Sequence, residues 1–274
     1  QKVTWGTDEI EQQGIIEALK VGTLRRNKKD LMPWLPPQTW MEHRIDSEVL
    51  NRSMERAIHA ECDRIFGPER NDNIHKRQKF IEGLVDGHAG VGVQAGVMSR
   101  LKKLLACAKV RFVVDEVVSY IRSAKYNGSP DRLVVMTGSA VAAAELVDLL
   151  KQHEGIRPGL ISGSQGKEKR AKLTESFQGG DADATNVLVC TILAAGQGIN
   201  LTAADTMFFI DWDWSHAMNE QAEARTHRSG LKSDKAVYVN FISSHWLDAA
   251  IAEACGRKKE YHKTIKNSAV AVTQ

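Results

Sequence analysis

The chain has 274 residues, of which 42% are hydrophobic, and a formal net charge of +3. This length and apolar content suit one large domain or two small ones, and the small charge does not require a nucleic-acid partner. The four cysteines are scattered and form no CxxC pair, which argues against a disulfide framework or a structural zinc site. No apolar run is long enough to cross a membrane and no signal peptide is visible, so we expect an intracellular, reducing compartment, either the cytoplasm of a prokaryote or virus-infected cell or a nucleus.

The first 124 residues are expected to be mainly helical, because apolar residues recur there at spacings of three and four. The pattern is already under way near Gln1, which suggests a segment of a longer protein. Residues 24–36 predict a basic turn and a proline-broken linker, and the alternation in 38–45 predicts a strand. A glycine-rich loop is expected over 87–96. The helices are predicted at 7–21, 46–66 with Ser47 as the N-cap, 69–86, 98–108 and 108–124.

Two short stretches imitate nucleotide-binding signatures but lack what the chemistry needs. The Asp115-Glu116 pair lies among valines at helical spacing and not at the end of a strand. We therefore expect surface charge there rather than a magnesium-binding acid pair. Gly166-Lys167 does not form a P-loop, because Glu168 stands where a serine or threonine would hold magnesium. The sequence predicts no metal site within this chain.

From Asp131 onward, short apolar runs alternate with helical segments. Repeated βα units with short connections predict an α/β fold with a parallel sheet covered by helices on both faces. Ligands of such sheets gather at the carboxyl ends of the strands, where we expect both the turn after Met136 and the glycine loop after Cys190. Strands are predicted at 133–136, 157–161, 187–190, 207–210 and 236–242, and helices at 139–152, 165–177, 216–228 and 246–261, ahead of a frayed tail from 267.

Residues 186–230 contain the strongest functional signal. A loop of small residues at 194–200 lies between two apolar strands, and its glycines let a backbone approach a phosphate or ribose closely. Gln221, Arg225 and Arg228 follow at spacings of four and three, so on a helix their side chains share one face. Guanidinium forks suit phosphate oxygens. Together these features predict a nucleotide site.

Three runs in this stretch resemble a known family. They are GINLTAAD at 198–205, DWDW at 211–214 and QAEARTHRSG at 221–230. In this order they resemble motifs V and VI of superfamily 2 helicase-type ATPases, in the version carried by the Swi/Snf branch of DNA translocases. The sequence departs from that pattern at Ser215-His216, where the family usually has Asn-Pro, and at Leu231, where it usually has Gln.

The resemblance implies the second, C-terminal RecA-like lobe of a two-lobed motor, with an N-terminal helical insertion. Residues 24–36 then resemble the basic element between the lobes. Implied partners are double-stranded DNA, the first lobe of the same protein and a possible protein bound through the insertion. ATP with Mg²⁺ is the implied cofactor, and the magnesium ligands are expected on the first lobe. The implied domains are 1–45 as the end of the inter-lobe linker region, 46–108 as the helical insertion, 109–266 as the lobe and 267–274 as the tail.

The resemblance also implies roles for individual residues. Arg225 and Arg228 would act as catalytic arginine fingers that stabilise charge on the γ-phosphate. The start of the helix near Ser139 offers exposed amide groups that suit a phosphate. The residues implied to contact ATP are Gln221, Gly196, Gly198 and Asn200, and those implied to contact nucleic acid are Thr137, Ser139, Gly163, Ser164 and Thr191.

Each of these assignments has a simpler alternative. Ser139 can merely cap its helix, and residues 161–170 can form a capped helix with a solvated basic face. The glycine loop can be a tight turn. The two arginines can be surface charge beside Glu220 and Glu223.

Two other functions remain open at this point: a strand-separating DNA or RNA helicase, and a non-catalytic module that binds DNA or a protein. No GxxxxGK[ST] and no DExH segment occurs in the sequence, so the phosphate cradle and the magnesium carboxylate of an ATPase are absent from this chain. We therefore expect an ATPase only as part of a longer protein, and no ATP hydrolysis by this chain alone.

Overall fold

The computed structural model describes residues 32–67, 93–127, 131–179, 181, 183–195, 198–213, 215–253 and 255–256. Residues 35–255 form one compact unit, and residues 1–34 with 256–274 are grouped as a second unit, most of which lies outside the described residues. Also outside them are the expected helices at 7–21 and 69–86, most of the 24–36 element, residues 87–92 of the glycine-rich loop, Gly196, Trp214 and the tail from 267.

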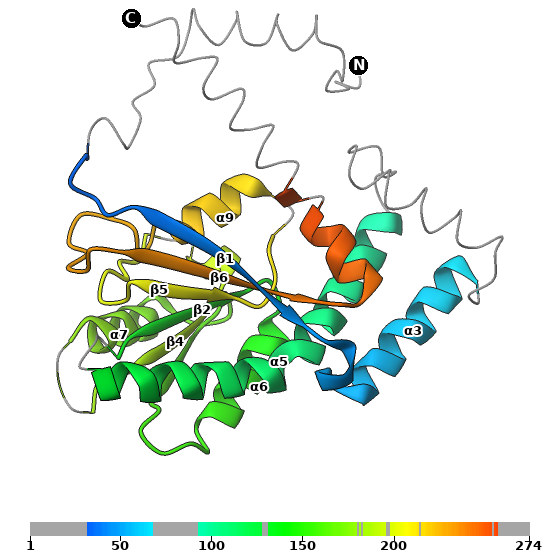
Figure 1. Cartoon of the computed structure of the whole chain (residues 1–274), viewed down its shortest axis with the longest axis horizontal. Helices are drawn as coiled ribbons and strands as arrows, with labels where there is room; N and C mark the ends of the chain where they lie inside the picture. Colours follow the sequence, from blue (N-terminus) through cyan, green and yellow to red (C-terminus); the bar gives the residue numbers. More distant parts are fainter. Residues whose placement is uncertain are drawn as a thin grey trace, which may run out of the picture. The chain divides into compact units, whose positions relative to one another are not determined.

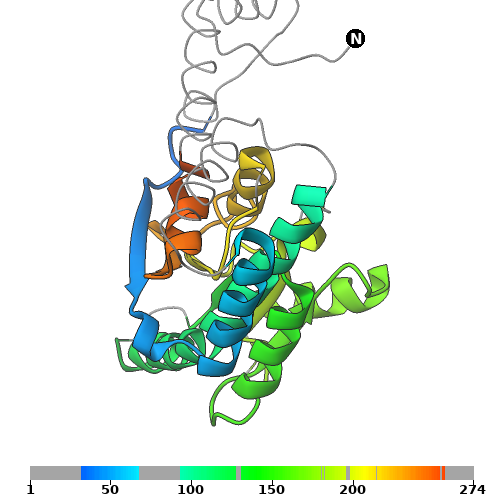
Figure 2. The ribbon, with the colours of Figure 1, turned by 90° about the vertical axis from the view of Figure 1, so that its right-hand side faces the viewer.

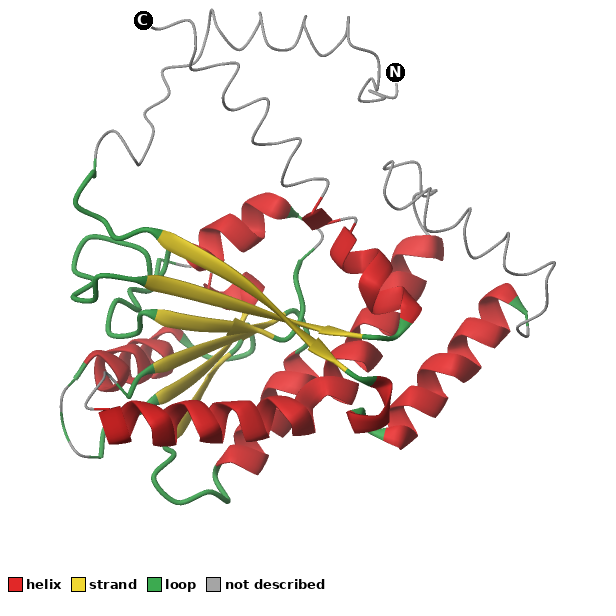
Figure 3. Ribbon diagram, in the orientation of Figure 1, coloured by secondary structure: helices red, strands yellow, loops and turns green. Residues whose placement is uncertain are grey.

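Six parallel strands form one sheet in the order β1-β6-β5-β2-β4-β3 (Figure 1). Figure 3 shows helices on both sides of it, which confirms the predicted α/β architecture. The five strands expected after Asp131 are all present, with ends shifted by no more than one residue. The strands are β1 (Gln38–Ile45), β2 (Leu133–Thr137), β3 (Pro158–Ile161), β4 (Val187–Thr191), β5 (Thr206–Phe209) and β6 (Ala236–Ser243).

The central strands are buried on both faces because their sequences are apolar almost throughout. Every residue of β2 is buried: Leu133 and Val135 belong to one hydrophobic cluster, whereas Val134 and Met136 belong to the other. Successive side chains of a strand point to opposite faces, so a continuous apolar run needs a layer of helices on each side. This pattern positions the sheet between two cores.

One face of the sheet is covered by α3 (Arg52–Phe66), α5 (Val93–Asn127), α6 (Ala140–Leu150) and a helix at 246–253. Figure 2 shows α3 and α6 packed along the long helix α5. The opposite face carries α7 (Lys167–Gln178), α8 (Ile192–Ala195) and α9 (His216–Glu223). None of the helices in the described part of the chain combines the length and apolar character needed to span a bilayer.

The sequence predicts two separate helices shortly before β2, whereas the structure has one long helix that packs on the sheet. The helices expected at 98–108 and 108–124 are a single helix, α5, which also includes residues 93–96 of the expected glycine-rich loop. No glycine or proline occurs from Val97 to Asn127 to interrupt it. The boundary expected at residue 108 therefore falls inside α5, whose buried side chains belong to the core of the sheet.

Strand β1 is confirmed where it was expected, but it belongs to the sheet rather than to a linker that ends at residue 45. It pairs with β6 over its whole length, from Gln38 opposite Ala236 onward. Ser47 begins a short 3-10 helix (Ser47–Val49) and is not the N-cap of α3. That role belongs to Asn51, whose Oδ1 accepts the backbone N–H of Ser53 at 3.1 Å.

Candidate functional site

The carboxyl edge of the sheet brings together the residues expected to bind nucleic acid. Strands β2, β4 and β3 are neighbours, and Thr137 is paired with Thr191 in the register. Strand β3 ends at Ile161, beside Cys190 of β4. Because parallel strands end at the same edge, the loops that follow them lie together. The residues collected there are Thr137, Ser139, Gly163, Ser164 and Thr191.

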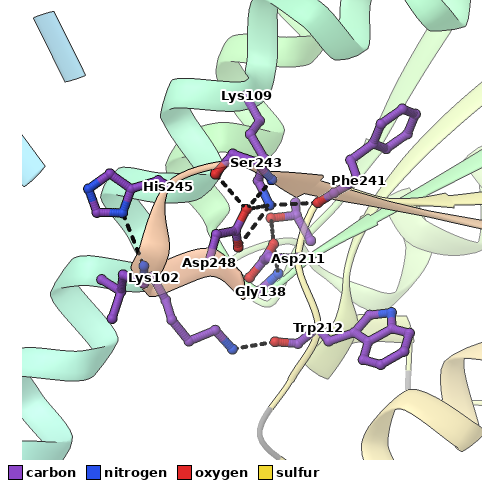
Figure 4. A network of polar contacts seen from close by, with 11 residues as sticks. Lys102, Lys109, Gly138, Asp211, Trp212, Phe241, Ser243, His245 and Asp248 are labelled. Carbon is purple, nitrogen blue, oxygen red and sulfur yellow. Dashed lines mark hydrogen bonds and ion pairs between the residues drawn. The ribbon is translucent and has the colours of Figure 1, made fainter. Parts of the chain in front are cut away.

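Two of these residues already have partners inside the protein. Thr137 is fully buried, and its Oγ1 donates a hydrogen bond to Oδ1 of Asp211 at 2.5 Å. The backbone N–H of Gly138 donates to the same oxygen at 3.0 Å (Figure 4). Ser139 caps α6, as the simpler alternative predicts, because its Oγ accepts the N–H of Ala142 at 3.2 Å. A phosphate would therefore have to displace the Asp211 carboxylate to reach these donors.

The loop between β3 and α7 is more open. Gly163 and Ser164 are exposed, and the hydroxyls of Ser162 and Ser164 lie 3.0 Å apart in a hydrogen bond. The N-cap of α7 is Gly166, which has no side chain to accept the first amide groups of the helix. Thr191 is nearly buried, with 7% of its surface exposed. Of the five predicted residues, Gly163 and Ser164 are therefore the most accessible to a large ligand.

The chain between α8 and β5 crosses from the carboxyl edge of the sheet to the amino edge, and we extend the name glycine loop to its residues 198–205. Gly198 has a φ of +79°, a conformation that favours glycine. Further along, the carbonyl of Asn200 accepts Nε2 of Gln178 at 3.0 Å, and Gln178 is the last residue of α7, which runs back from the carboxyl edge. The prediction that this loop lies at the carboxyl edge is therefore wrong for Asn200, because the chain must return to the start of the next parallel strand.

Helix α9 ends at Glu223, so the predicted helix at 216–228 is too long. The backbone N–H of His227 still donates to the carbonyl of Glu223 at 3.2 Å, but that of Arg228 donates to the carbonyl of Thr226 at 2.9 Å, so helical pairing stops there. Residues 224–230 form a turn instead. We call residues 224–230 the arginine turn.

Gln221 is exposed on α9, whereas Arg225 and Arg228 lie on the arginine turn. Arg225 is half-buried and Arg228 is exposed. Burial lowers the pKa of Arg225, and the positive charge of Arg228 lowers the pKa further. The two guanidinium groups are therefore close enough to repel each other, although they do not share a helix face as predicted.

The glycine loop and the arginine turn are joined directly. The N–H of Leu201 donates to the carbonyl of Arg225 at 2.9 Å. At the end of the turn, Gly230 has a φ of +103°, and a Cβ atom there would lie 3.5 Å from Oγ1 of Thr202. A groove of about 370 Å³ is lined by Gln178, Thr202 and Gly230 among others. The segment that follows Gly198 and the arginine turn are thus neighbours near the amino edge of the sheet.

The segment that enters β1 also contacts the arginine turn. Nε2 of His227 lies 2.8 Å from the carbonyl oxygen of Pro36. The amide of Gln38 donates to the hydroxyl of Tyr238 at 3.2 Å, and that hydroxyl donates to the carbonyl of Glu223 at 3.4 Å. Pro36 is therefore connected to the arginine turn, and Gln38, the first residue of β1, is connected through Tyr238 to the last residue of α9.

A buried ion pair joins α5 to the end of β6 (Figure 4). Nζ of Lys109 donates to Oδ2 of Asp248 at 3.0 Å and to the carbonyl of Phe241 at 2.9 Å. The side chains of Lys109 and Asp248 are only 1% and 9% exposed. The backbone N–H and Oγ of Ser243 donate to the same carboxylate oxygen at 2.7 and 2.9 Å. On the same helix, Lys102 donates to a carbonyl of the loop after β5. The network fixes α5 against the carboxyl ends of β5 and β6.

Three structurally important residues are not singled out by the sequence. Asp211 follows the apolar strand β5, and a carboxylate at the carboxyl end of a strand could have been predicted to lie near a ligand. Gln178 gives no such signal, because its nearest bonded partner is 22 residues away along the chain. Lys109 and its partner Asp248 are 139 residues apart.

Comparison with known proteins shows what this chain is similar to. Residues 109–230 match the family described as "Helicase conserved C-terminal domain", a range that includes every predicted site residue. The crystal structure of the C-terminal part of the Fun30 ATPase domain aligns with a TM-score of 0.57 and 14% identity, over 81% of this chain and 89% of that one. The Sulfolobus solfataricus SWI2/SNF2 ATPase C-terminal domain aligns with a TM-score of 0.54 and 14% identity, over 84% and 90%. The fold is therefore that of RecA-like C-terminal ATPase domains.

Fungal proteins extend the likeness to the sequence. "Helicase swr1" of Aspergillus fumigatus is 34% identical over 118 residues, which are 42% of this chain and 7% of that protein. "Helicase SWR1" of Saccharomyces cerevisiae is 33% identical over 124 residues, 44% of this chain and 8% of that protein. The chain is therefore similar to the helicase-type C-terminal lobes of Swi/Snf proteins. "Helicase SWR1" of Cryptococcus neoformans is 29% identical over 152 residues, which are 56% of this chain. The lobe spans 12% or less of the length of these curated relatives.

Proposed function

We propose that this chain is the second motor lobe of a Swi/Snf-type, ATP-dependent translocase or remodeller of double-stranded DNA. One observation carries the proposal: the arginine turn is hydrogen-bonded to the glycine loop, from Leu201 to Arg225, at 2.9 Å. This contact keeps two guanidinium groups beside a backbone loop that suits a ribose or a phosphate. ATP would bind in the cleft between this lobe and a first lobe of the same protein, and its hydrolysis would drive closure and opening of the two.

The described residues fit a triphosphate better than they fit a metal. Arg225 and Arg228 offer forked donors to phosphate oxygens, and Gln221 adds an exposed amide. Gly198 and Asn200 would approach the ribose. In the described ranges no group of three His, Cys, Asp or Glu side chains gathers as it would around a metal ion. Because the sequence lacks the acid pair of an ATPase, we assign the Mg²⁺ ligands to the first lobe, where bound Mg²⁺ would neutralise charge on the phosphates.

The loop that begins α7 would bind the DNA backbone. Gly163 and Ser164 are exposed at the carboxyl edge, and Lys167, Lys169 and Lys172 add exposed positive charge along α7. Lysines near phosphates release counterions, which supplies affinity that does not depend on base sequence. Thr191 lies at the same edge. Thr137 and Ser139 would join this interface only if Asp211 releases their loop.

The protein that carries both lobes is expected to hydrolyse ATP much faster with duplex DNA than with single-stranded DNA, RNA or no nucleic acid. We expect duplex DNA to stimulate hydrolysis because the proposed translocase moves along the backbone of double-stranded DNA. Steady-state ATPase assays with the four conditions at matched nucleotide concentration test this. A stronger response to single strands or RNA would favour a strand-separating helicase instead.

This chain alone is expected to hydrolyse no ATP, with or without duplex DNA. Its sequence lacks the P-loop and the acid pair that hold the phosphates and the metal. Phosphate release by the purified chain measures this directly. Turnover above the buffer background that persists after Arg228→Ala would contradict the assignment of the missing machinery to another lobe.

A further inference from the structure

We infer that Gln178 is a positioning residue, which holds the glycine loop, and through it the arginine turn, in the geometry required for ATP hydrolysis. The inference rests on the proposed function and adds to it a residue that lies outside both sequence motifs. Gln178 is the last residue of α7, and it lines the groove that the glycine loop and the arginine turn share.

Gln178 uses both ends of its side-chain amide on the glycine loop. Nε2 donates to the carbonyl of Asn200 at 3.0 Å and to Oγ1 of Thr202 at 3.3 Å. Oε1 accepts the backbone N–H of Ala203 at 2.8 Å. A carboxamide can donate and accept at the same time, so one side chain satisfies two backbone groups and a hydroxyl over four consecutive residues. An alanine or a carboxylate at this position could not do so.

The amide of Gln178 is held in place by its neighbours. Phe177, the preceding residue, is fully buried in the core beneath α7. The guanidinium of Arg132 donates from Nε to the carbonyl of Phe177 at 3.2 Å and from Nη2 to the carbonyl of Gly179 at 2.9 Å. The helix end therefore sits on a fixed support, and little conformational freedom is lost when the amide meets the loop.

Only one residue separates the contacts of Gln178 from the arginine turn. Leu201 lies between Asn200 and Thr202, and its N–H donates to the carbonyl of Arg225 at 2.9 Å. Loss of the bonds on either side of Leu201 lets this residue move, and the carbonyl that it holds moves with it. A displacement of about 1 Å in an active site can cost about 10²-fold in rate.

The same helix begins at the loop proposed to bind DNA. Helix α7 has 12 residues, so its length of about 18 Å spans the distance from Gly163 and Ser164 to Gln178. Gln178 therefore fixes the glycine loop relative to the element that would contact the DNA backbone. This makes the response to DNA, as well as the basal rate, sensitive to Gln178.

In the protein that carries both lobes, Gln178→Ala is expected to lower kcat of duplex-stimulated hydrolysis by about 10- to 100-fold while KM for ATP changes by less than about threefold. Gln178→Glu retains the acceptor for Ala203 but turns an oxygen toward the carbonyl of Asn200, so it should not rescue the rate. Gln152→Ala, which removes an exposed amide after α6, is the matched control and should retain the rate. A rise in KM with unchanged kcat would overturn the positioning role.

A double-mutant cycle separates positioning from a general loss of stability. If Gln178 acts through the arginine turn, Gln178→Ala should lower kcat by a clearly smaller factor in the Arg225→Ala variant than in the unaltered protein. Equal losses in both backgrounds would overturn the inference.

Amide hydrogen exchange provides a readout that does not depend on activity. Gln178→Ala should accelerate exchange in peptides that cover 198–204 and leave the strands of the sheet protected. Unchanged exchange there would overturn the inference even if the unaltered protein hydrolyses ATP. If the unaltered protein shows no ATPase activity, the proposed function fails, while the exchange result still decides whether Gln178 holds the loop.

Discussion

Replacing Arg228 by alanine in the two-lobed protein is expected to lower kcat of ATP hydrolysis by about 10³-fold or more. Arg228 is exposed at the turn that is bonded to the glycine loop, and an arginine delivered to the transferred phosphoryl group stabilises charge that develops only in the transition state. Its charge also lowers the pKa of the half-buried Arg225, so a bound phosphate would relieve repulsion between the two. Steady-state kinetics at saturating duplex DNA gives kcat and KM for ATP.

Arg122→Ala is the matched control for Arg228→Ala. It removes the same charge from an exposed position on α5, and kcat should stay within about twofold of the unaltered value. Duplex binding in the absence of ATP should be equal in both variants, which separates a loss of chemistry from a loss of DNA affinity. An Arg228→Ala protein that hydrolyses ATP at the normal rate would reject the arginine-finger role and favour a non-catalytic interaction module.

Lys109→Met is expected to destabilise the chain by about 3–5 kcal/mol, because it leaves the Asp248 carboxylate buried without its charged partner. Ser243 would still donate to that carboxylate, so the remaining charge is only partly compensated. The carbonyl of Phe241 would also lose a donor. The free energy of unfolding, measured with urea, tests the prediction.

Two further variants determine whether the lost stability comes from the buried pair. Lys103→Met lies on the exposed side of the same helix and should change the unfolding free energy by less than about 0.5 kcal/mol. Lys109→Met combined with Asp248→Asn should recover part of the loss, because no unpaired charge remains and an amide oxygen can still accept from Ser243. Strictly additive losses would mean that packing by the lysine stem, and not the ion pair, holds α5.

The sheet is predictable from the sequence because its signals are local. The apolar runs of β2, β4 and β5 require burial on both faces, and the alternation at 38–45 identifies β1. The extent of α5 is less predictable, since a run of glycines near 87–96 suggests a loop that the helix partly overrides. The pairing of β1 with β6 joins residues about 200 positions apart, which no local pattern reveals.

The candidate site is predictable in composition but not in its contacts. The spacing of Gln221, Arg225 and Arg228 indicates a phosphate site, yet α9 ends at Glu223, before both arginines. At the carboxyl edge, Thr137 has the residue type and position expected of a phosphate ligand. Its partner Asp211 is 74 residues away, so its occupied hydroxyl is visible only in the folded chain.

The entry of the chain beside the arginine turn has a mechanical consequence. Strand β1 is paired with β6 along all eight of its residues, so a pull along the strand is shared by a whole ladder of bonds loaded in shear. Ahead of that ladder, the carbonyl of Pro36 contacts His227, and the carbonyl of Pro37 accepts the N–H of Ala236 at 3.2 Å. Tension on the incoming segment would therefore be transmitted to β6 through Pro37 and also to His227, which lies between Arg225 and Arg228 in the arginine turn. A pull on the segment before β1 would thus load both the sheet and the turn that carries the two guanidinium groups, so mechanical force and the geometry of the candidate site are coupled.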